Sequence, residues 1–378
     1  MHTSDHHVQG LDNNQVIADW PAISAAEVEW LKSRYPQLAG DCEVAWHSPR
    51  PFSAAALLQS PQGRFFVKRH HHHVRSAAVL EEEHRFIAHL ADAGVPVVHV
   101  LPDRVGATAV EHGDWTFELH AEAPGEDVYR DVPSWTPPNE VEQAWQAGRM
   151  LATLHNAADS YHAPQRDTHV LVARDELIRA EDPIVVLKTQ LLQRPGLADY
   201  LAGRPWETEL QRAILPWHVG VAARLASVPP QWGHNDWHVS NLLWHQHGRA
   251  NDVAAVLDFG LASPASHLFD LATAIERNAI AWLELERGSA AVRGDIALAL
   301  IVGYRDARPL TAGQVHLLAD LLPLVHLDFA LSEVEYFHGI TGSTANADIA
   351  YYTFLLGHAD WFRTAHGQAL LATLRAAA

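Results

Sequence analysis

Cysteine is almost missing from this sequence of 378 residues, in which Cys42 is the only one. A single thiol can form no disulfide within the chain, and it cannot build a zinc cluster of several cysteines. Structural disulfides belong to oxidising compartments. We therefore expect the protein to be cytoplasmic.

Long apolar runs are missing as well. The first ten residues, MHTSDHHVQG, are polar and lack the basic start and apolar core of a signal peptide. The apolar tracts near Ile296 and Leu321 are short or are interrupted by polar residues such as Asp320 and His326. We expect neither export nor a membrane span.

Positive charge is scarce, because 27 Lys and Arg residues face 45 Asp and Glu residues and give a net charge of −18 with neutral histidines. No run of Lys and Arg forms a basic patch, and a negative surface repels the phosphates of nucleic acids. Nucleic acid is therefore not an expected partner. The oligomeric state stays open.

The residues that are present suffice for two lobes, since 48 % of them are hydrophobic. A capping box of Ser24 and Glu27 predicts a short helical extension, and helical periodicity predicts a helix from about Ser76 to Ala93. Alternating patterns predict antiparallel strands at 43–48, 54–59, 64–70, 108–111 and 115–120. The pair Pro124-Gly125 ends this sheet, so we place the boundary of the first lobe after residue 120.

The second lobe, residues 121–378, is predicted to be mostly helical. Helices are expected at 141–157, 184–192, 207–225, 266–285, 290–307, 311–339 with breaks, and 347–377. The predicted fold class is therefore α+β with two lobes.

The stretch from His234 to Gly260 interrupts these helices and carries the chemistry. It places Asp236 and Asn241 in a loop after a proline pair, and a hairpin of residues 242–244 and 253–257 then delivers Asp258. An acid can orient an attacking hydroxyl, while an amide and a second acid can hold Mg²⁺ against phosphates. This pattern indicates magnesium-dependent phosphoryl transfer.

Two residues upstream fit the same site. Lys68 ends a predicted strand, and Glu83 falls on the apolar stripe of the following helix. A carboxylate in that position needs a cation, which Lys68 can supply, or it reaches water at the edge of the stripe. The sequence leaves both readings open.

With these motifs the chain resembles the aminoglycoside phosphotransferase family, the small-molecule branch of the protein-kinase-like fold that includes choline and homoserine kinases. The matching residues are Lys68 in FFVKRH, Glu83 in EEEHRF, Leu154-His155, HNDWHVSN at 234–241, LDFG at 257–260 and Asp270 in FDLA. The resemblance implies a bilobal kinase-like fold with a nucleotide-binding first lobe.

The resemblance also implies a role for each matched residue. Lys68 would contact the α- and β-phosphates of ATP, with GTP as an alternative, and Glu83 would hold Lys68. Asp236 would be the catalytic base, Asn241 and Asp258 would bind Mg²⁺, and Asp270 would brace the catalytic loop. The remaining implied contact is a hinge that accepts adenine, formed by His120, Ala121 and Ala123.

Two departures from protein kinases bear on the substrate. Asn235 stands where protein kinases carry an Arg, and no A-P-E follows; both favour a small-molecule acceptor over a protein. The loop His47–Ser53 contains no glycine, which a backbone that closes over phosphates usually needs. Ser48 and Ser53 are the candidate donors to phosphate there.

Several residues have a structural alternative that we favour. His234 and His238 are more typical of residues that hold a loop than of proton carriers, and Trp237 and Trp244 are more typical of a core than of a cation cage. The run His70–His73 could bind Zn²⁺ or Ni²⁺, but it lacks a carboxylate at ligand spacing, so a solvated strand end is the preferred interpretation.

The acceptor pocket is the least defined part. His238, Asp328, Glu333 and Tyr336 are candidates, because the resembled family builds this pocket from its C-terminal helices and uses acids to select amines; a solvated acidic face is the alternative. The leading hypothesis is an ATP- and Mg²⁺-dependent kinase of a hydroxyl on an aminoglycoside, sugar, nucleoside or related small molecule. The rivals are a choline-, ethanolamine- or homoserine-like kinase and a non-catalytic nucleotide- or metal-binding module.

Overall fold

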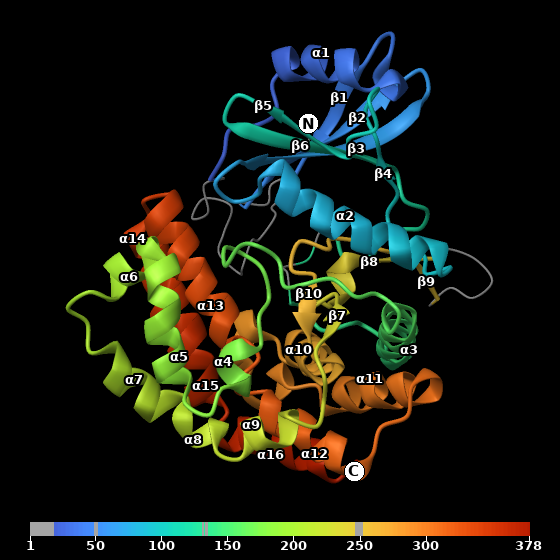
Figure 1. Ribbon diagram of the computed structural model, residues 1–378. Coiled ribbons are helices and arrows are strands. Elements are labelled where there is room, and N and C mark those ends of the chain that lie inside the picture. Colours follow the sequence, from blue (N-terminus) through green and yellow to red (C-terminus); the bar gives the residue numbers. More distant parts are fainter. Residues whose placement is uncertain (1–18, 49–51, 131, 133–134, 246–251) are drawn as a thin grey trace. The chain divides into compact units, whose positions relative to one another are not determined.

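The computed structural model of the protein describes residues 19–48, 52–130, 132, 135–245 and 252–378, and Figure 1 labels its helices and strands. These residues form two compact units. The first contains the described residues up to 132 together with Leu242–Leu257, and the second contains Trp135–Asn241 and Asp258–Ala378. The division into functional lobes after residue 120 stays a prediction.

The first unit is built on an antiparallel sheet in the order β1-β2-β3-β6-β4, with β5 paired to β6. Its strands are β1 (Glu43–His47), β2 (Ala54–Ser60), β3 (Gly63–His71), β4 (Val100–Leu101), β5 (Ala109–His112) and β6 (Trp115–Ala121). Its helices are α1 (Ala25–Arg34) and α2 (Ala77–Asp92), and a separate hairpin consists of β8 (Leu242–Trp244) and β9 (Val253–Val256). The strands and the helix predicted for residues 43–120 are thus confirmed. The two-residue strand β4 is present in addition and was not predicted.

The two faces of this sheet are covered differently. Leu31 of α1 packs with Leu58, Val67 and Phe117 in one buried apolar cluster, whereas α2 lies on the opposite face in Figure 1 and directs His84 to the sheet. Period-two alternation places these apolar side chains on one face and leaves polar side chains for the other.

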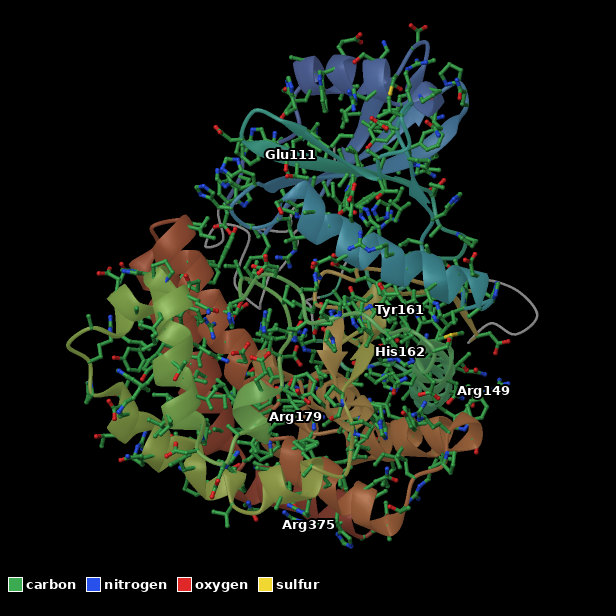
Figure 2. All side chains as sticks on the ribbon, in the orientation of Figure 1. Glu111, Arg149, Tyr161, His162, Arg179 and Arg375 are labelled. Atoms are coloured by element: carbon green, nitrogen blue, oxygen red, sulfur yellow. The ribbon has the colours of Figure 1, made fainter. Side chains whose placement is uncertain are left out.

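Both helices of the first unit start at capping residues, of which Ser24 was predicted as a cap. The Oγ of Ser24 accepts a hydrogen bond from the N–H of Glu27 at 3.3 Å, and the Glu27 carboxylate accepts one from the Ser24 N–H at 2.7 Å. For α2, the Oγ of Ser76 accepts from the N–H of Val79, and the carboxylate of Glu111 (Figure 2) accepts from the N–H of Ala77 at 3.1 Å. These bonds satisfy N–H groups that have no partner inside a helix.

The second unit is mostly helical. Its longer helices are α3 (Val141–Ala158), α10 (His267–Ala279), α11 (Gly294–Ala307), α12 (Ala312–Leu321), α13 (Leu327–Val334) and α16 (Ala365–Arg375). Shorter ones are α4 (Glu176–Arg179), α5 (Pro183–Gln190), α6 (Pro195–Leu201), α7 (Trp206–Ala213), α8 (Leu215–His218), α9 (Val221–Leu225), α14 (Thr344–Asp348) and α15 (Gly357–Trp361). A two-stranded ribbon of β7 (Gln231–Gly233) and β10 (Ser263–Ala265) borders the predicted catalytic loop.

Specific contacts fix the helices of the second unit. α3 and α11 approach so closely at Gly148 and Gly303 that a Cβ on either glycine would overlap a backbone carbonyl of the other helix. Arg179 of α4 donates to the carbonyls of Leu225, the last residue of α9, and of Val228. Arg375 of α16 pairs with Asp320 of α12 at 2.8 Å, and Figure 2 labels both arginines. These helices therefore form a tightly packed bundle.

The α+β fold class is confirmed, but several predicted helices are broken. The helix predicted over 207–225 is three helices: α7 ends before Pro216, which lacks an N–H and lies in the first turn of α8, and Gly220, whose φ is 76°, separates α8 from α9. The helix predicted over 266–285 ends at Ala279. Among the described residues, no helix is both long and apolar enough to cross a membrane.

Candidate active site

The loop that follows β7 carries the predicted catalytic acid on an unusual backbone. Asn235, directly before Asp236, has a φ of 60°, a left-handed conformation that Asn tolerates better than most residues. The Nδ2 of Asn235 donates to the carbonyl and Oγ of Ser263 on β10, at 3.0 and 3.2 Å. These side-chain hydrogen bonds therefore hold the left-handed backbone of Asn235 directly before Asp236.

Asp270 braces this loop from α10. Its Oδ2 accepts the N–H of His234 and its Oδ1 accepts the N–H of Asn235, both at 2.8 Å. The Nε2 of His155 lies 3.0 Å from Oδ2, and the Asp270 side chain is 0 % exposed. A Cβ at Gly233 would collide with Oδ2, so only glycine allows this approach.

The carboxylate of Asp236 is 17 % exposed and is surrounded by polar side chains. The Nδ2 of Asn241 donates to the Asp236 carbonyl at 2.9 Å and to its Oδ2 at 3.3 Å. The Nε2 of His238 lies 3.7 Å from Oδ1, and the guanidinium of Arg277 makes an ion-pair contact with the same oxygen. The structure thus brings together Asp236, Asn241 and the acceptor candidate His238.

Arg277 was not predicted from the sequence. It lies on α10, its guanidinium is over the rings of Phe329 and Trp135 at 5.3 and 5.8 Å, and it is almost fully buried. Burial lowers the pKa of Arg277 to about 10, although the negative charge of Glu333 opposes this shift. Its spacing of two helical turns from Asp270 puts both side chains on the same face of α10, which is the signal that could have revealed it.

Asp258 also has a left-handed backbone, with a φ of 55°. Leu242 pairs with Val256 in the β8–β9 hairpin. Asn241 comes directly before the first strand of this hairpin, and Asp258 comes two residues after the end of the second. The Oδ1 of Asn241 accepts no hydrogen bond from the described residues, although the side chain is buried. An amide oxygen and a carboxylate of this kind are the ligands that Mg²⁺ prefers.

The first unit contains the residues predicted to bind nucleotide. Lys68 of β3 lies opposite Glu118 of β6 in the sheet register, and Glu83 of α2 is only 3 % exposed. Glu83 is thus not at a solvated edge of its helix. In the predicted hinge, the N–H of Ala121 already donates to the carbonyl of His99 at 2.9 Å.

The other predicted nucleotide contacts lie at the ends of strands. Ser48 follows β1, and Ser53 precedes β2; part of the loop between them, residues 49–51, lies outside the described residues. His120 is the penultimate residue of β6, and Ala123 follows that strand. The structure therefore places all of them in the same unit as Lys68.

A buried carboxylate in the first unit was not anticipated. Glu118 accepts hydrogen bonds from the Nε2 atoms of His120, His84 and His70 at 2.7, 2.8 and 3.0 Å. Burial alone would raise the pKa of Glu118, but the charge of His120 and the three imidazole hydrogen bonds hold it well below its usual range. This carboxylate is therefore ionised and fully hydrogen-bonded.

Comparison with known proteins decides the family. Residues 52–310 match the model of the phosphotransferase enzyme family, which covers more than half of the chain. The chain belongs to this family. An uncharacterized protein of Deinococcus radiodurans is 27 % identical over 304 residues, which cover 78 % of this chain and 76 % of the relative.

Solved structures show that this phosphotransferase has the kinase-like fold. The amicoumacin kinase hAmiN, in complex with AMP-PNP, Ca²⁺ and amicoumacin, aligns with a TM-score of 0.61 at 14 % identity, over 92 % of this chain and 97 % of that one. A microcompartment-associated aminopropanol kinase aligns with a TM-score of 0.57 at 16 % identity, over 94 % and 100 % of the two chains. The predicted family and the predicted fold are both confirmed.

The acid-rich helix of this phosphotransferase is not a solvated acidic face. Asp328, Glu333 and Tyr336, the predicted acceptor residues, are all buried. The Oδ1 of Asp328 lies 3.0 Å from Nη1 of Arg194, a residue that is itself fully buried. Burial raises the pKa of Asp328 while Arg194 opposes that shift, so this carboxylate already has a protein partner.

The predicted structural residues are buried in the phosphotransferase. The Nδ1 of His234 accepts a hydrogen bond from the N–H of Asp236 at 3.2 Å, which is the contact of a residue that holds the loop. Trp237 and Trp244 are 0 and 1 % exposed, as expected for core residues. The rings of His71, His72 and His73 lie 4.3 to 4.9 Å apart at the end of β3.

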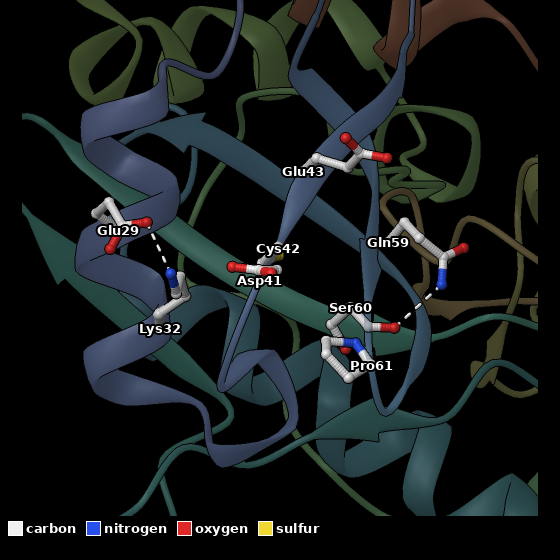
Figure 3. Close-up of a pocket in the computed structure, with 8 residues that line it drawn as sticks. All are labelled: Glu29, Lys32, Asp41, Cys42, Glu43, Gln59, Ser60 and Pro61. Atoms are coloured by element: carbon white, nitrogen blue, oxygen red, sulfur yellow. Dashed lines mark hydrogen bonds and ion pairs between the residues drawn. The ribbon is translucent and has the colours of Figure 1, made fainter.

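Figure 3 shows a pocket on the first unit that none of the predicted site residues lines. The lining residues are Glu29, Lys32, Asp41, Cys42, Glu43, Gln59, Ser60 and Pro61. Lys32 is paired with Glu29 at 2.8 Å, and burial raises the pKa of the Cys42 thiol, which disfavours the reactive thiolate. The pocket therefore contains no activated nucleophile.

Proposed function

We propose that this phosphotransferase is a small-molecule kinase that transfers the γ-phosphate of ATP to a hydroxyl group of its acceptor. The observation that carries the proposal is the loop at Asp236. Three separate devices hold it: the left-handed Asn235, the two backbone bonds to Asp270, and the bond from Asn241. A strained backbone that is fixed so completely is typical of a functional site.

Asp236 would orient the acceptor hydroxyl and accept its proton. In phosphoryl transfer the protein contributes mainly position and electrostatics, so the orientation of this carboxylate matters more than its basicity. Asn241 fixes one side of Asp236, and Arg277 contacts the other. Arg277 would thereby keep the carboxylate turned to the acceptor.

Asn241 and Asp258 would hold Mg²⁺. The free Oδ1 of Asn241 and the carboxylate of Asp258 form a donor set of oxygens that suits this ion. When bound, Mg²⁺ neutralises the negative charge of the phosphates. Support for a metal and a nucleotide comes from hAmiN, whose complex contains AMP-PNP and Ca²⁺.

The first unit would bind the nucleotide. We assign Lys68 to the α- and β-phosphates, Glu83 to the support of Lys68, and Ser48 and Ser53 to the phosphate loop. The adenine hinge would be formed by His120, Ala121 and Ala123; because the N–H of Ala121 is already used, its neighbours would have to supply the hinge donor. These roles make residues 1–120 the core of the nucleotide lobe.

The acceptor is proposed only as a class of small hydroxylated molecules. His238 lies near Asp236, and Glu333 is a buried acid that acts electrostatically on Arg277, so both remain acceptor candidates together with Asp328 and Tyr336. The names of the two aligned kinases include amicoumacin and aminopropanol, and aminopropanol is an amino alcohol. An amine-bearing acceptor is therefore the first to try.

The test is an acceptor panel. ADP release from Mg-ATP is measured with aminoglycosides, sugars, nucleosides, amino alcohols and hydroxy amino acids, and mass spectrometry then identifies a phosphorylated product. We expect at least one acceptor to raise ADP release above hydrolysis by water. Failure to bind Mg-AMP-PNP in calorimetry would contradict the proposal.

A further inference from the structure

Three buried side chains of the second unit lie together although they come from distant parts of the sequence. Glu276 belongs to α10, His326 directly precedes α13, and His358 belongs to α15. One ligand atom from each lies within 4.8 Å of the other two. The three residues are 3, 3 and 8 % exposed, so the helices enclose a small polar site of two imidazoles and one carboxylate.

His326 is oriented as metal-binding histidines are. Its Nε2 lies 2.9 Å from the carbonyl oxygen of Leu355, which can only accept, so the ring proton is on Nε2 and Nδ1 carries a lone pair. That Nδ1 is buried and has no hydrogen-bond partner among the described residues. Metal-binding histidines commonly donate their second ring N–H to a backbone carbonyl in this way.

The carboxylate of Glu276 also lacks a strong cationic partner. No Lys or Arg of the described chain lies within ion-pairing distance of it, and the Nδ1 of His358 lies 3.1 Å from its Oε1. His358 is held in place by stacking on Trp282, with ring centroids 3.5 Å apart and planes at 6°. A buried carboxylate is costly without a compensating charge, and a metal ion would supply that charge and would also pair with the orphan Nδ1 of His326.

We propose that Glu276, His326 and His358 bind a divalent transition-metal ion of the zinc class. Two imidazoles and a carboxylate suit zinc and its neighbours, whereas Mg²⁺ prefers oxygen ligands. Three protein ligands leave a fourth position for water. The ion would join α10, α13 and α15, and it would be distinct from Mg²⁺ at Asn241 and Asp258.

Charged and polar neighbours of this site are already engaged. Arg277 follows Glu276 in the sequence, but its guanidinium contacts Asp236, and the negative charge of Glu333 favours its charged form. The indole N–H of Trp282 donates to the carbonyl of Glu276 at 3.2 Å. The one interaction that the ion would replace is the contact between His358 and Glu276, both of which would become its ligands.

Two other histidine clusters fit a metal less well. Around Glu118, each of the three Nε2 atoms already hydrogen-bonds the carboxylate, so that network is complete without an ion. The His71, His72 and His73 rings are more exposed and have no carboxylate in their group. That run would still bind zinc weakly, so it must be removed from the test.

The experiment uses the full chain with His71, His72 and His73 changed to Asn, stripped of metal with a chelator. Zn²⁺ is then titrated in competition with a chromophoric chelator, without nucleotide, and Co²⁺ is added separately for its absorption spectrum. We expect one ion per chain, a Co²⁺ spectrum typical of nitrogen and oxygen ligands, and no displacement by excess Mg²⁺. No binding at micromolar Zn²⁺ would overturn the proposal.

Three variants in the same background locate the ion. H326Q keeps an amide N–H for the Leu355 carbonyl but removes Nδ1, and E276Q keeps the shape of the carboxylate but removes its charge. Both should weaken Zn²⁺ binding by at least about 100-fold while circular dichroism of the metal-free proteins is unchanged. H84Q is the matched control in the Glu118 cluster and should bind Zn²⁺ normally; loss of the ion in H84Q, or its retention in H326Q, contradicts the assignment.

Discussion

Two acids on the same helix, α10, have opposite surroundings. Asp270 is 0 % exposed and accepts the backbone N–H groups of His234 and Asn235, with His155 at 3.0 Å. Glu276, about two turns later, is 3 % exposed and has one imidazole at 3.1 Å. Burial raises the pKa of Glu276 to about 7. Burial is therefore similar at the two acids, and their partners decide what each can do.

The surroundings of Asp270 hold a single geometry, whereas the surroundings of Glu276 can accept a positive charge. At the Asp270 end, both carboxylate oxygens accept backbone N–H groups of the loop that leads to Asp236. At the Glu276 end, His326 keeps an unpaired Nδ1, and burial lowers its pKa to about 4 while the neighbouring His358 opposes its charge further. Such an unsatisfied site is costly when empty and favours a bound cation.

The largest effect is expected at Asp270. D270N should lower the free energy of unfolding by about 3 to 5 kcal/mol, because one of the two backbone N–H groups or His155 loses a charged acceptor inside the protein. Urea denaturation at pH 8 measures this loss, and the surface variant D159N is the control. A change below about 1 kcal/mol would show that Asp270 does not brace the loop.

The next effect is a pH dependence at Glu276. Because folding raises the pKa of Glu276 from 4.5 to about 7, the folded state holds this proton more tightly, and the stabilisation is complete below pH 4.5 and lost as pH rises through 7. Metal-free wild type should therefore lose stability relative to E276Q by an amount on the order of 3 kcal/mol between pH 4.5 and pH 8. Denaturation of both proteins across this range checks it; a constant difference would contradict the prediction.

Arg277 follows Glu276 in the sequence and contacts Asp236. Because that contact is to the proposed catalytic acid, removal of Arg277 should affect activity more than nucleotide binding. R277Q should lower kcat by about 10- to 100-fold, which corresponds to about 1.4 to 2.7 kcal/mol, because Asp236 loses the contact that orients it. R277K keeps the charge and should recover part of the rate. Steady-state kinetics with the acceptor from the panel measures both, and an unchanged kcat in R277Q would assign Arg277 to structure alone.

The smallest effect is expected at an exposed ion pair far from either acid. Arg375 of α16 is 40 % exposed and pairs with Asp320. Solvent screens such a pair, so R375A should change the free energy of unfolding by less than about 1 kcal/mol. Thermal unfolding of R375A is measured beside that of D270N. If R375A loses as much stability as D270N, burial and hydrogen-bond partners do not distinguish the Arg375 pair from Asp270.

The contact between Asp236 and Asn241 could be predicted from the sequence because these residues act at short range. Asp236 and Asn241 are five positions apart, and their contact depends on a local turn that prolines and Asn235 specify. The strands and α2 of the first unit were predicted for the same reason, since alternation and helical periodicity are local patterns.

The remaining features depend on contacts between distant segments. His326 and His358 reach Glu276 only because α13 and α15 pack against α10, and no local pattern specifies that packing. The three histidines around Glu118 come likewise from β3, α2 and β6. The predicted acceptor pocket would depend on the same kind of packing, which is why the sequence offers candidate residues for it but no substrate.

One measurement tests the central claim, that Asp236 is the acid on which phosphoryl transfer depends. Wild type and D236N are compared for turnover of the acceptor identified by the panel and, by calorimetry, for binding of Mg-AMP-PNP. We predict that kcat of D236N falls by about 10²- to 10⁴-fold while nucleotide affinity is unchanged. Equal turnover in the two proteins would contradict the account.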